Sequence, residues 1–212
     1  MSRASCMPVA TAEEGLQALA TMLGWNGGVL PFWSDDGTSR PSRRYLPCAD
    51  DLYRRLDAAR MLHDGRHSRE VTLGLPEVRE SSFPFSTVLW CWVQGKDQVW
   101  RAATQFQPAP SMVLRIDGST RRLLLWWLKE PLDYPAIEPA NRKIAYALHA
   151  TQKLGCPREL RIPLPGAFVR VGRSRPAAVI VTRLDGRAFT RREIVSDLKD
   201  PPSKDAWREK RR

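Results

Sequence analysis

The first third of the chain alternates two helix-like segments with shorter runs. Residues 11–23 begin with a threonine and two glutamates and then repeat leucines every three or four positions, which predicts a capped amphipathic helix. Residues 50–62 repeat apolar side chains at the same spacing and predict a second helix. Between them, 29–33 indicates a short strand, and 34–44 (SDDGTSRPSRR) indicates a flexible polar loop.

From residue 70 onward, strand-like and helix-like patterns alternate. The turn at 117–120 (DGST) predicts a hairpin, because Asp-Gly accepts the left-handed backbone that a tight turn needs. A largely antiparallel sheet flanked by helices, an α+β fold, is the class that this order favours. The expected elements are strands at 70–76 and 87–94, a helix at 97–107, strands at 112–116 and 123–128, a helix at 138–154 closed by Gly155, a strand at 177–182 and a short helix from Thr190.

The length of 212 residues suits one full domain, and an apolar fraction of 42% predicts a packed core. We divide the chain into a mixed N-terminal part over 1–69, an alternating core over 70–198 and a charged tail with two prolines over 199–212. The first two parts are expected to belong to the same domain.

The charge balance is strongly basic. Lys and Arg number 34 against 23 Asp and Glu, which leaves a net charge of +11 at pH 7, and most of the basic residues are arginines. Guanidinium groups suit phosphate oxygens and bases, so one interpretation is a polyanion partner, most simply nucleic acid. The other is an arginine-rich surface in contact with water, which a GC-rich genome also produces. Composition leaves both open.

Cysteine and histidine usage gives no sign of a metal or redox site. The four cysteines form no CxxC pair, and Gly65 interrupts the helical spacing of His63 and His67. The N-terminus has no apolar signal-peptide core, and no segment approaches eighteen apolar residues. We therefore expect a cytoplasmic protein with no cofactor, no bound metal and no membrane association.

Three runs from residue 88 onward raise questions about chemistry. The strand 88-VLWCWVQG-95 places Trp90 and Trp92 on one face and ends in an amide and a glycine, where a strand feeding an active site usually ends in an ionisable group. The second run is 111-SMVLRIDGSTRRLLLWWLKEP-131, and the third is 161-RIPLPGAFVR-170.

Taken in order, with VIVTRLDGRAFTRREI after them, these runs resemble the primase-polymerase domain of the archaeo-eukaryotic primase superfamily, in the branch found in plasmid and phage replication proteins. The resemblance covers residues 70–198 and implies a core like the RNA-recognition motif. It rests on the shared order of several weak motifs. The structural positions that match the family are Trp90, Trp126, Glu130-Pro131 and Pro165-Gly166.

The resemblance also implies where catalytic residues would stand, and those positions have changed. The family's two metal-binding aspartates fall on Trp92 and Gln94, neither of which carries a carboxylate. Its phosphate-contacting histidine falls on Leu123, and its asparagine falls on Val169. Because three motifs keep structural residues and lose chemical ones, the resemblance implies a primase-like fold without primase activity.

Other interpretations stay open at this point. An active enzyme would need relocated acids, for which Asp117 with Asp97 or Asp185 is the available set, although Asp117 is better explained as a turn residue and Asp185-Gly186 as a second hairpin turn. Trp92 either stacks bases or fills the vacated nucleotide pocket, and the apolar Leu123 favours filling. A third alternative is a scaffold that binds only proteins.

The favoured interpretation is a catalytically inactive protein that acts in replication of a plasmid or phage. Its expected partners are DNA, single-stranded or as a primer-template, and a replicative helicase or an active primase. The candidate nucleic-acid-binding residues are Arg115, Arg121, Arg122, Arg170, Arg173 and Arg175.

Overall fold

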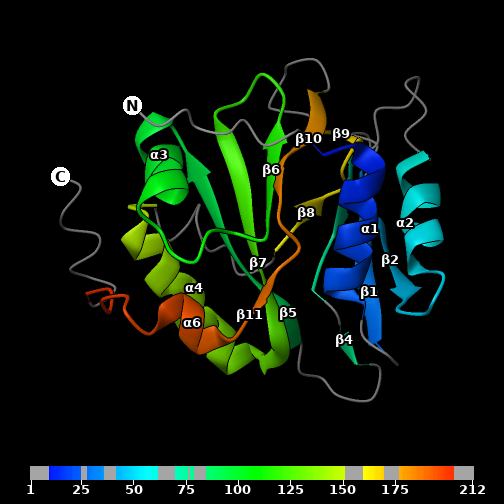
Figure 1. Ribbon diagram of the computed structural model, residues 1–212. Coiled ribbons are helices and arrows are strands. Elements are labelled where there is room, and N and C mark those ends of the chain that lie inside the picture. Colours follow the sequence, from blue (N-terminus) through cyan, green and yellow to red (C-terminus); the bar gives the residue numbers. More distant parts are fainter. Residues whose placement is uncertain are drawn as a thin grey trace.

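The structure is a computed structural model that describes residues 10–24, 28–35, 42–61, 70–75, 77–78, 85–150, 160–169 and 177–202. Two largely antiparallel sheets stand side by side, and helices lie on both faces of the larger one (Figure 1). The α+β class predicted from the sequence is therefore confirmed. Within the described residues, no helix has both the length and the apolar run needed to cross a bilayer.

The smaller sheet gathers strands from distant parts of the sequence. Its order is β2-β1-β3-β8, with β4 paired to β1. The bounds in the first part of the chain are α1 (Ala12–Leu23), β1 (Gly28–Asp35), β2 (Ser42–Pro47), α2 (Leu52–Met61), β3 (Glu70–Leu73) and β4 (Glu77–Val78). The strand β8 (Ile162–Pro163) joins from far along the chain by pairing with β3.

The larger sheet carries the β-α-β-β-α-β order that the sequence predicted from the third strand onward. The strand β7 pairs with β5 along one edge and with β6 and β11 along the other, and β10 and β9 follow beyond β6. The elements are β5 (Phe85–Gln94), α3 (Lys96–Thr104), β6 (Met112–Ile116), β7 (Arg121–Asp133), α4 (Tyr134–Ala147), β9 (Phe168–Val169), β10 (Ala177–Leu184), β11 (Ala188–Phe189) and α6 (Arg191–Val195).

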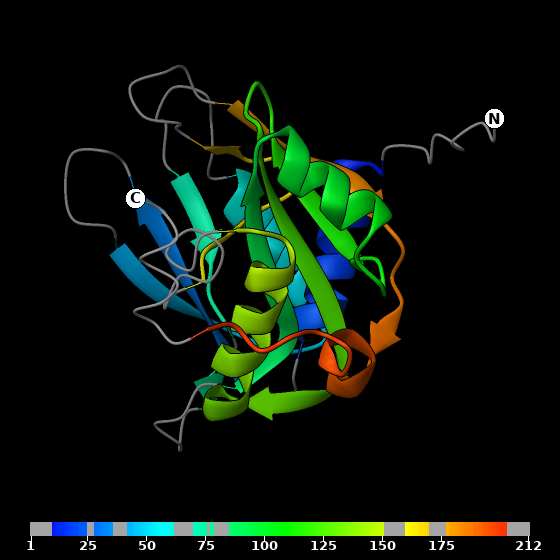
Figure 2. The ribbon, with the colours of Figure 1, turned by 90° about the vertical axis from the view of Figure 1, so that its left-hand side faces the viewer.

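The larger sheet has two distinct faces, which we call the α1 face and the α4 face. On the α1 face, Gly15 of α1 approaches Val181 so closely that a Cβ at this glycine would overlap the valine side chain. On the α4 face, α4 packs against β5 and β7, and Phe106, after α3, lies with its ring 5.0 Å from that of Trp126. Figure 2 shows α3, α4 and α6 together in front of the sheet.

The core follows the alternation of the strands. On the α1 face, Leu123 and Leu125 are fully buried, and on the α4 face Cys91 and Trp126 are equally buried. Both faces of β5 and β7 are therefore covered, which explains why these strands read as nearly continuous apolar runs in the sequence.

The hairpin between β6 and β7 forms as predicted. Gly118 has a φ of 66°, and the N–H of Ser119 donates to the carbonyl of Ile116 at 3.0 Å. A second hairpin at Asp185-Gly186 does not form, because β11 pairs in parallel with β7 and not with β10. The chain still turns at Gly186, whose φ is 69°.

Two further predictions need correction. The polar segment 34–44 is not a loop throughout, because β2 begins at Ser42 and pairs with β1. The long helix begins at Tyr134 and ends at Ala147, so the predicted start at 138 and end at 154 are both wrong. Gly155, its predicted cap, lies outside the described residues.

Candidate functional site

The positions on which the sequence resemblance places the family's metal ligands and histidine meet on the α1 face. Trp92 on β5 and Leu123 on β7 are direct cross-strand partners, and Gln94 is paired in the same way with Arg121. Alternation along each strand puts all four side chains on the same face. Two positions assigned from separate motifs therefore lie next to each other, as residues of one site would.

Side chains fill this site. Leu123 is fully buried, Trp92 is half-buried against the core, and Trp90, two residues earlier on the same face, is 3% exposed. The guanidinium carbon of Arg121 lies 4.8 Å from the centre of the Trp92 ring, a cation–π contact. Gln94 is exposed. An indole, a leucine and an arginine cannot bind a divalent cation, so the site has no ligand set for one.

Val169, aligned with the family's asparagine, stands at a distance from this group. It lies on β9 at the edge of the larger sheet, paired with Ala177 of β10, and it is 3% exposed. Strand order puts β10, β6 and β7 between β9 and β5, so Val169 does not contact Trp92 across the strands. This position is also packed with apolar atoms.

The acidic residues considered as replacements are dispersed. Asp117 directly follows the last residue of β6, and its N–H donates to the carbonyl of Ala178. The N–H of Asp185 donates to the carbonyl of Ser111, which directly precedes the first residue of β6. The length of β6 separates them by roughly 17 Å, at about 3.3 Å per residue. Asp117 and Asp185 therefore cannot bind the same metal ion. Asp97 is exposed in the first turn of α3.

Each of the two hairpin-like turns uses its aspartate for ion pairing. Asp117 lies 3.4 Å from Arg115 Nη2. Asp185 accepts hydrogen bonds from Arg187 and Arg183, and those bonds, Arg187's foremost, hold the pKa of its carboxyl below the usual value against the opposing effect of burial. No group of three or more His, Cys, Asp or Glu side chains within the described residues is placed to bind a metal.

The candidate arginines divide between the two faces of the sheet. Arg121 lies on the α1 face over Trp92. Arg115 and Arg122 are direct cross-strand partners on the opposite, α4 face, where Arg122 pairs on its other side with Val93. The remaining three candidates, Arg170, Arg173 and Arg175, lie outside the described residues, as do His63 and His67.

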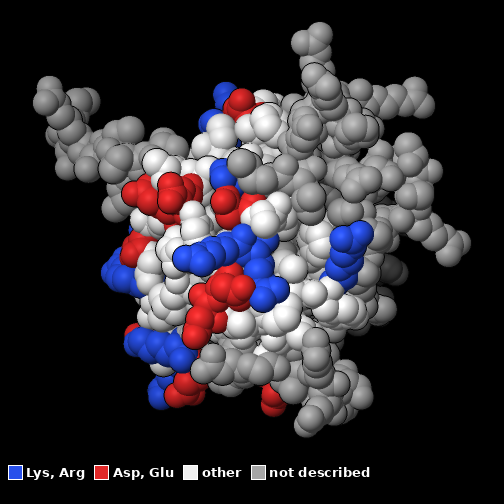
Figure 3. Space-filling model, turned by 90° about the vertical axis from the view of Figure 1, so that its right-hand side faces the viewer, with Lys and Arg blue, Asp and Glu red and all other residues white. Residues whose placement is uncertain are grey.

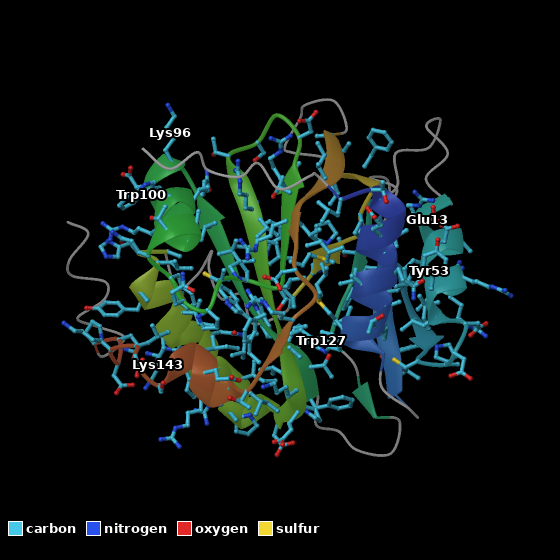
Figure 4. The ribbon with its side chains drawn as sticks, in the orientation of Figure 1. Glu13, Tyr53, Lys96, Trp100, Trp127 and Lys143 are labelled. Atoms are coloured by element: carbon cyan, nitrogen blue, oxygen red, sulfur yellow. The ribbon has the colours of Figure 1, made fainter. Side chains whose placement is uncertain are left out.

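Three aromatic residues that were not predicted as site residues are exposed within the described part of the chain. Phe168 on β9 is 45% exposed, Trp100 on α3 is 54% exposed and Tyr45 on β2 is 48% exposed. Figure 4 shows Trp100 and Lys96 pointing outward from α3. Alternation around the Pro165-Gly166 turn is the only signal that would have marked Phe168, and it is weak over a two-residue strand.

A shallow depression lies between α1 and α2, away from the replaced positions. Its lining includes Glu13, Glu14 and Tyr53, and the Tyr53 hydroxyl donates to Glu13 at 3.3 Å (Figure 4). Figure 3 shows acidic and basic side chains interspersed over the face that carries α2. The described residues on this face do not form the uniformly positive surface that favours phosphate binding.

The fold of the chain is that of primase-polymerase domains. It is similar to the domain of the cyanophage S-2L primase-polymerase (PrimPol AEP domain), with a TM-score of 0.58 and 12% identity over 88% of this chain and 97% of that one. It is also similar to primase RepB', with a TM-score of 0.59 and 11% identity over 84% of this chain and 58% of that one.

A third similar structure is the catalytic domain of primase RepB' in complex with initiator DNA. Its TM-score is 0.60 at 11% identity, and the match covers 85% of this chain and 89% of that one. No protein-family model and no curated protein sequence matches the chain. At these identities the similarity establishes the fold alone. The activity has to be inferred from the residues of the site.

Proposed function

We propose that this chain is a primase-polymerase-like protein that has lost nucleotidyl transfer and acts in the replication of a plasmid or phage by binding DNA and an active replication partner. The observation that carries the proposal is the pairing of Trp92 with Leu123 on one face of β5 and β7. These positions stand where the resembled family has a metal-binding carboxylate and a histidine, and here they pack together as apolar neighbours.

Nucleotidyl transfer needs divalent cations that bridge the attacking hydroxyl and the nucleotide phosphates. Neither Trp92 nor Gln94 supplies a carboxylate for them, and Arg121 places a positive charge where a cation would bind. Asp117 and Asp185 lie at opposite ends of β6. These observations support the loss of activity over the alternative of relocated acids.

Binding to DNA is supported by charge and by a relative. The net charge of +11 favours a polyanion, and the similar RepB' catalytic domain was solved in complex with initiator DNA. A protein partner, a replicative helicase or an active primase, belongs to the proposal because a domain without transfer chemistry cannot prime synthesis itself. Co-purification with the product of a neighbouring replication gene tests that part.

A primer-synthesis assay tests the central claim. The chain is incubated with single-stranded template, nucleotides and Mg2+ or Mn2+, beside an active primase-polymerase as positive control. We expect no dinucleotide or longer product from the chain. Product that disappears in an Asp117→Ala variant would show that relocated acids support catalysis, and the proposed loss of activity would be wrong.

A further inference from the structure

A row of side chains crosses the α4 face beyond the part that α3 and α4 cover. Arg122 on β7, Arg115 on β6 and Ile180 on β10 are successive cross-strand partners. Phe168 on β9 lies on the same face at the sheet edge, where it pairs with Ala178, two residues before Ile180 on β10. The side chain of Arg115 is 35% exposed and Phe168 is 45% exposed. At about 4.8 Å between strands, the row is roughly 15 Å long.

The positive charges of Arg115 and Arg122 repel each other across the two strands. Like charges directly opposite each other on neighbouring strands repel, and burial, followed by the charge of Arg115, lowers the pKa of Arg122 below its usual value. Within the described part of the chain, no carboxylate is within ion-pair distance of Arg122, whose Nη1 donates only to the carbonyl of Thr120. The pair therefore attracts an anion from solution.

The one acidic neighbour does not cancel this attraction. Asp117 lies 3.4 Å from Arg115 Nη2, but its side chain is 58% exposed, so the contact is long and screened by water. A phosphate can replace it, since a guanidinium fork donates hydrogen bonds to two oxygens of one phosphate.

An aromatic side chain next to a pair of arginines on an open sheet is the arrangement that binds single-stranded nucleic acid. Bases stack on the aromatic ring, and the backbone phosphates contact the basic groups. Duplex DNA keeps its bases stacked on one another, so it would use the arginines and leave Phe168 unused.

We infer that the row formed by Arg122, Arg115, Ile180 and Phe168 is a binding surface for single-stranded DNA, on the face of the sheet opposite to the replaced catalytic positions. Arg115 and Arg122 contact phosphates, and Phe168 stacks a base. The inference rests on the DNA-binding part of the proposed function and specifies where the strand lies.

Fluorescence anisotropy with a labelled oligothymidylate of about 15 nucleotides, and with a duplex of the same length, tests the surface. The variants are R115Q/R122Q and Phe168→Ala. The matched control is R44Q/R54Q, which removes the same charge from two exposed arginines on β2 and α2.

We expect R115Q/R122Q to weaken binding and to reduce the slope of log K against log salt by about 1.4, at about 0.7 for each lost phosphate contact with a single strand. The control should keep the slope of the native protein. Phe168→Ala should weaken oligothymidylate binding about fivefold or more while leaving duplex binding unchanged.

Two failures are distinguishable. If the native protein binds oligothymidylate but R115Q/R122Q keeps its affinity and slope, this surface is wrong and DNA binding stands. If the native protein binds no DNA at low salt, the DNA-binding part of the proposed function fails and this inference fails with it. A Phe168→Ala variant with native single-strand affinity overturns the stacking role.

Measuring the thermal midpoint of each variant shows whether a loss of DNA binding results only from unfolding. Because R115Q/R122Q removes a repulsive pair, we expect its thermal midpoint to be equal to or higher than that of the native protein. Weaker DNA binding together with an unchanged or raised midpoint supports a binding role. A lower midpoint would show that the two arginines stabilise the sheet, which contradicts the inference.

Discussion

Trp92 and Gln94 lie two residues apart on the same face of β5, yet their surroundings differ. Trp92 packs against the core and beneath the guanidinium of Arg121, whereas Gln94 is exposed at the end of the strand. Both stand where the resembled family has an aspartate. The sequence identified both positions as changed but could not show that only Trp92 is part of the packed core.

Replacing each residue by aspartate separates the two positions. Trp92→Asp should lower the free energy of unfolding by about 2–3 kcal/mol, less than the cost of emptying a fully buried aromatic site because Trp92 is half-buried. Gln94→Asp should change it by less than about 0.5 kcal/mol. Urea denaturation of both variants measures the difference. An open nucleotide pocket at Trp92 would instead make the two substitutions equally mild.

At the scale of the element, helix ends show how side chains fix the architecture. Thr11 and Glu14 form a reciprocal capping box at the start of α1, with the Thr11 hydroxyl accepting from the Glu14 N–H at 3.1 Å. The sequence predicted this start from the threonine and the acids that follow it. Since α1 covers the α1 face, its cap also helps to keep the replaced site closed.

Thr11→Ala should lower the free energy of unfolding by about 1 kcal/mol, because the Glu14 N–H at the helix start loses its side-chain acceptor. For a chain of this size the expected fall in thermal midpoint is about 2–4 °C. Thr21→Ala is the matched control: its hydroxyl bonds only to the Gln17 carbonyl within the helix, so the midpoint should hardly change. Equal effects of the two substitutions would exclude a capping role.

The turn between β10 and β11 depends on the charge of Asp185. Its carboxylate bonds Arg187 Nε at 2.6 Å and Arg183 Nη2 at 3.0 Å, while its N–H donates to Ser111. Because these partners lower the pKa of Asp185 in the folded state, the stabilisation is full above the unfolded pKa of about 4 and is lost as pH falls through the folded value.

Asp185→Asn should therefore reduce the free energy of unfolding by about 1–2 kcal/mol at pH 7. The difference from the native protein should shrink as pH falls below about 4. Urea titrations at pH 7 and at the lowest pH at which the chain stays folded measure it, with Asp197→Asn as an exposed control. A difference that stays constant with pH would contradict the ionic origin of the stabilisation.

The ends of α4 show why part of the fold could not be predicted. The sequence predicted a start at 138, whereas the helix begins at Tyr134, and Pro135 occupies the first turn, where its missing N–H costs nothing. The helix ends in a Schellman motif, in which His149 has a φ of 55° and the Ala150 N–H donates to Ala145. Histidine rarely takes this position, so the sequence pointed to Gly155 instead.

The candidate site shows what sequence could and could not reveal. Motif order alone brought Trp92 and Leu123 together, because both occupy fixed places relative to turns that the sequence marks clearly. The division of Arg121 and Arg122 between two faces also follows from strand alternation, but only once the strand is known to start at Arg121. The two-residue strands β4, β8, β9 and β11 carry too little pattern to be predicted.

At the scale of the whole molecule, the distribution of charge over the surface indicates more about where DNA would bind than the net charge does. The full chain has a net charge of +11, and among the described residues on the α2 side acids and bases are mixed (Figure 3). On the larger sheet, Arg115 and Arg122 stand together with a single long contact to an acid. A strand of DNA is therefore expected to prefer the sheet to the helical side, which composition alone could not indicate.

The smaller sheet combines strands from the first part of the sequence with one strand from its later part. The strand β1 pairs with β3, and β3 with β8, so the smaller sheet needs residues from before 36 and after 161. The helix α1 contributes to the core of both sheets, contacting α2 on one side and β10 on the other. The described residues before position 70 thus share strand partners and core contacts with later parts of the chain.

A fragment of residues 70–212 should consequently fail to fold, although it contains all the sequence motifs, within residues 70–198, that resemble primase-polymerases. It would lose β1, the partner of β3, and expose the apolar side chains beneath α1, including Val181. We expect the full chain to unfold in one transition by tryptophan fluorescence and far-ultraviolet circular dichroism, and the fragment to show no cooperative transition. Co-expression with residues 1–69 should restore a soluble complex, because each piece then regains its strand partners. A fragment that folds alone with a sharp transition would show that the larger sheet is an independent domain.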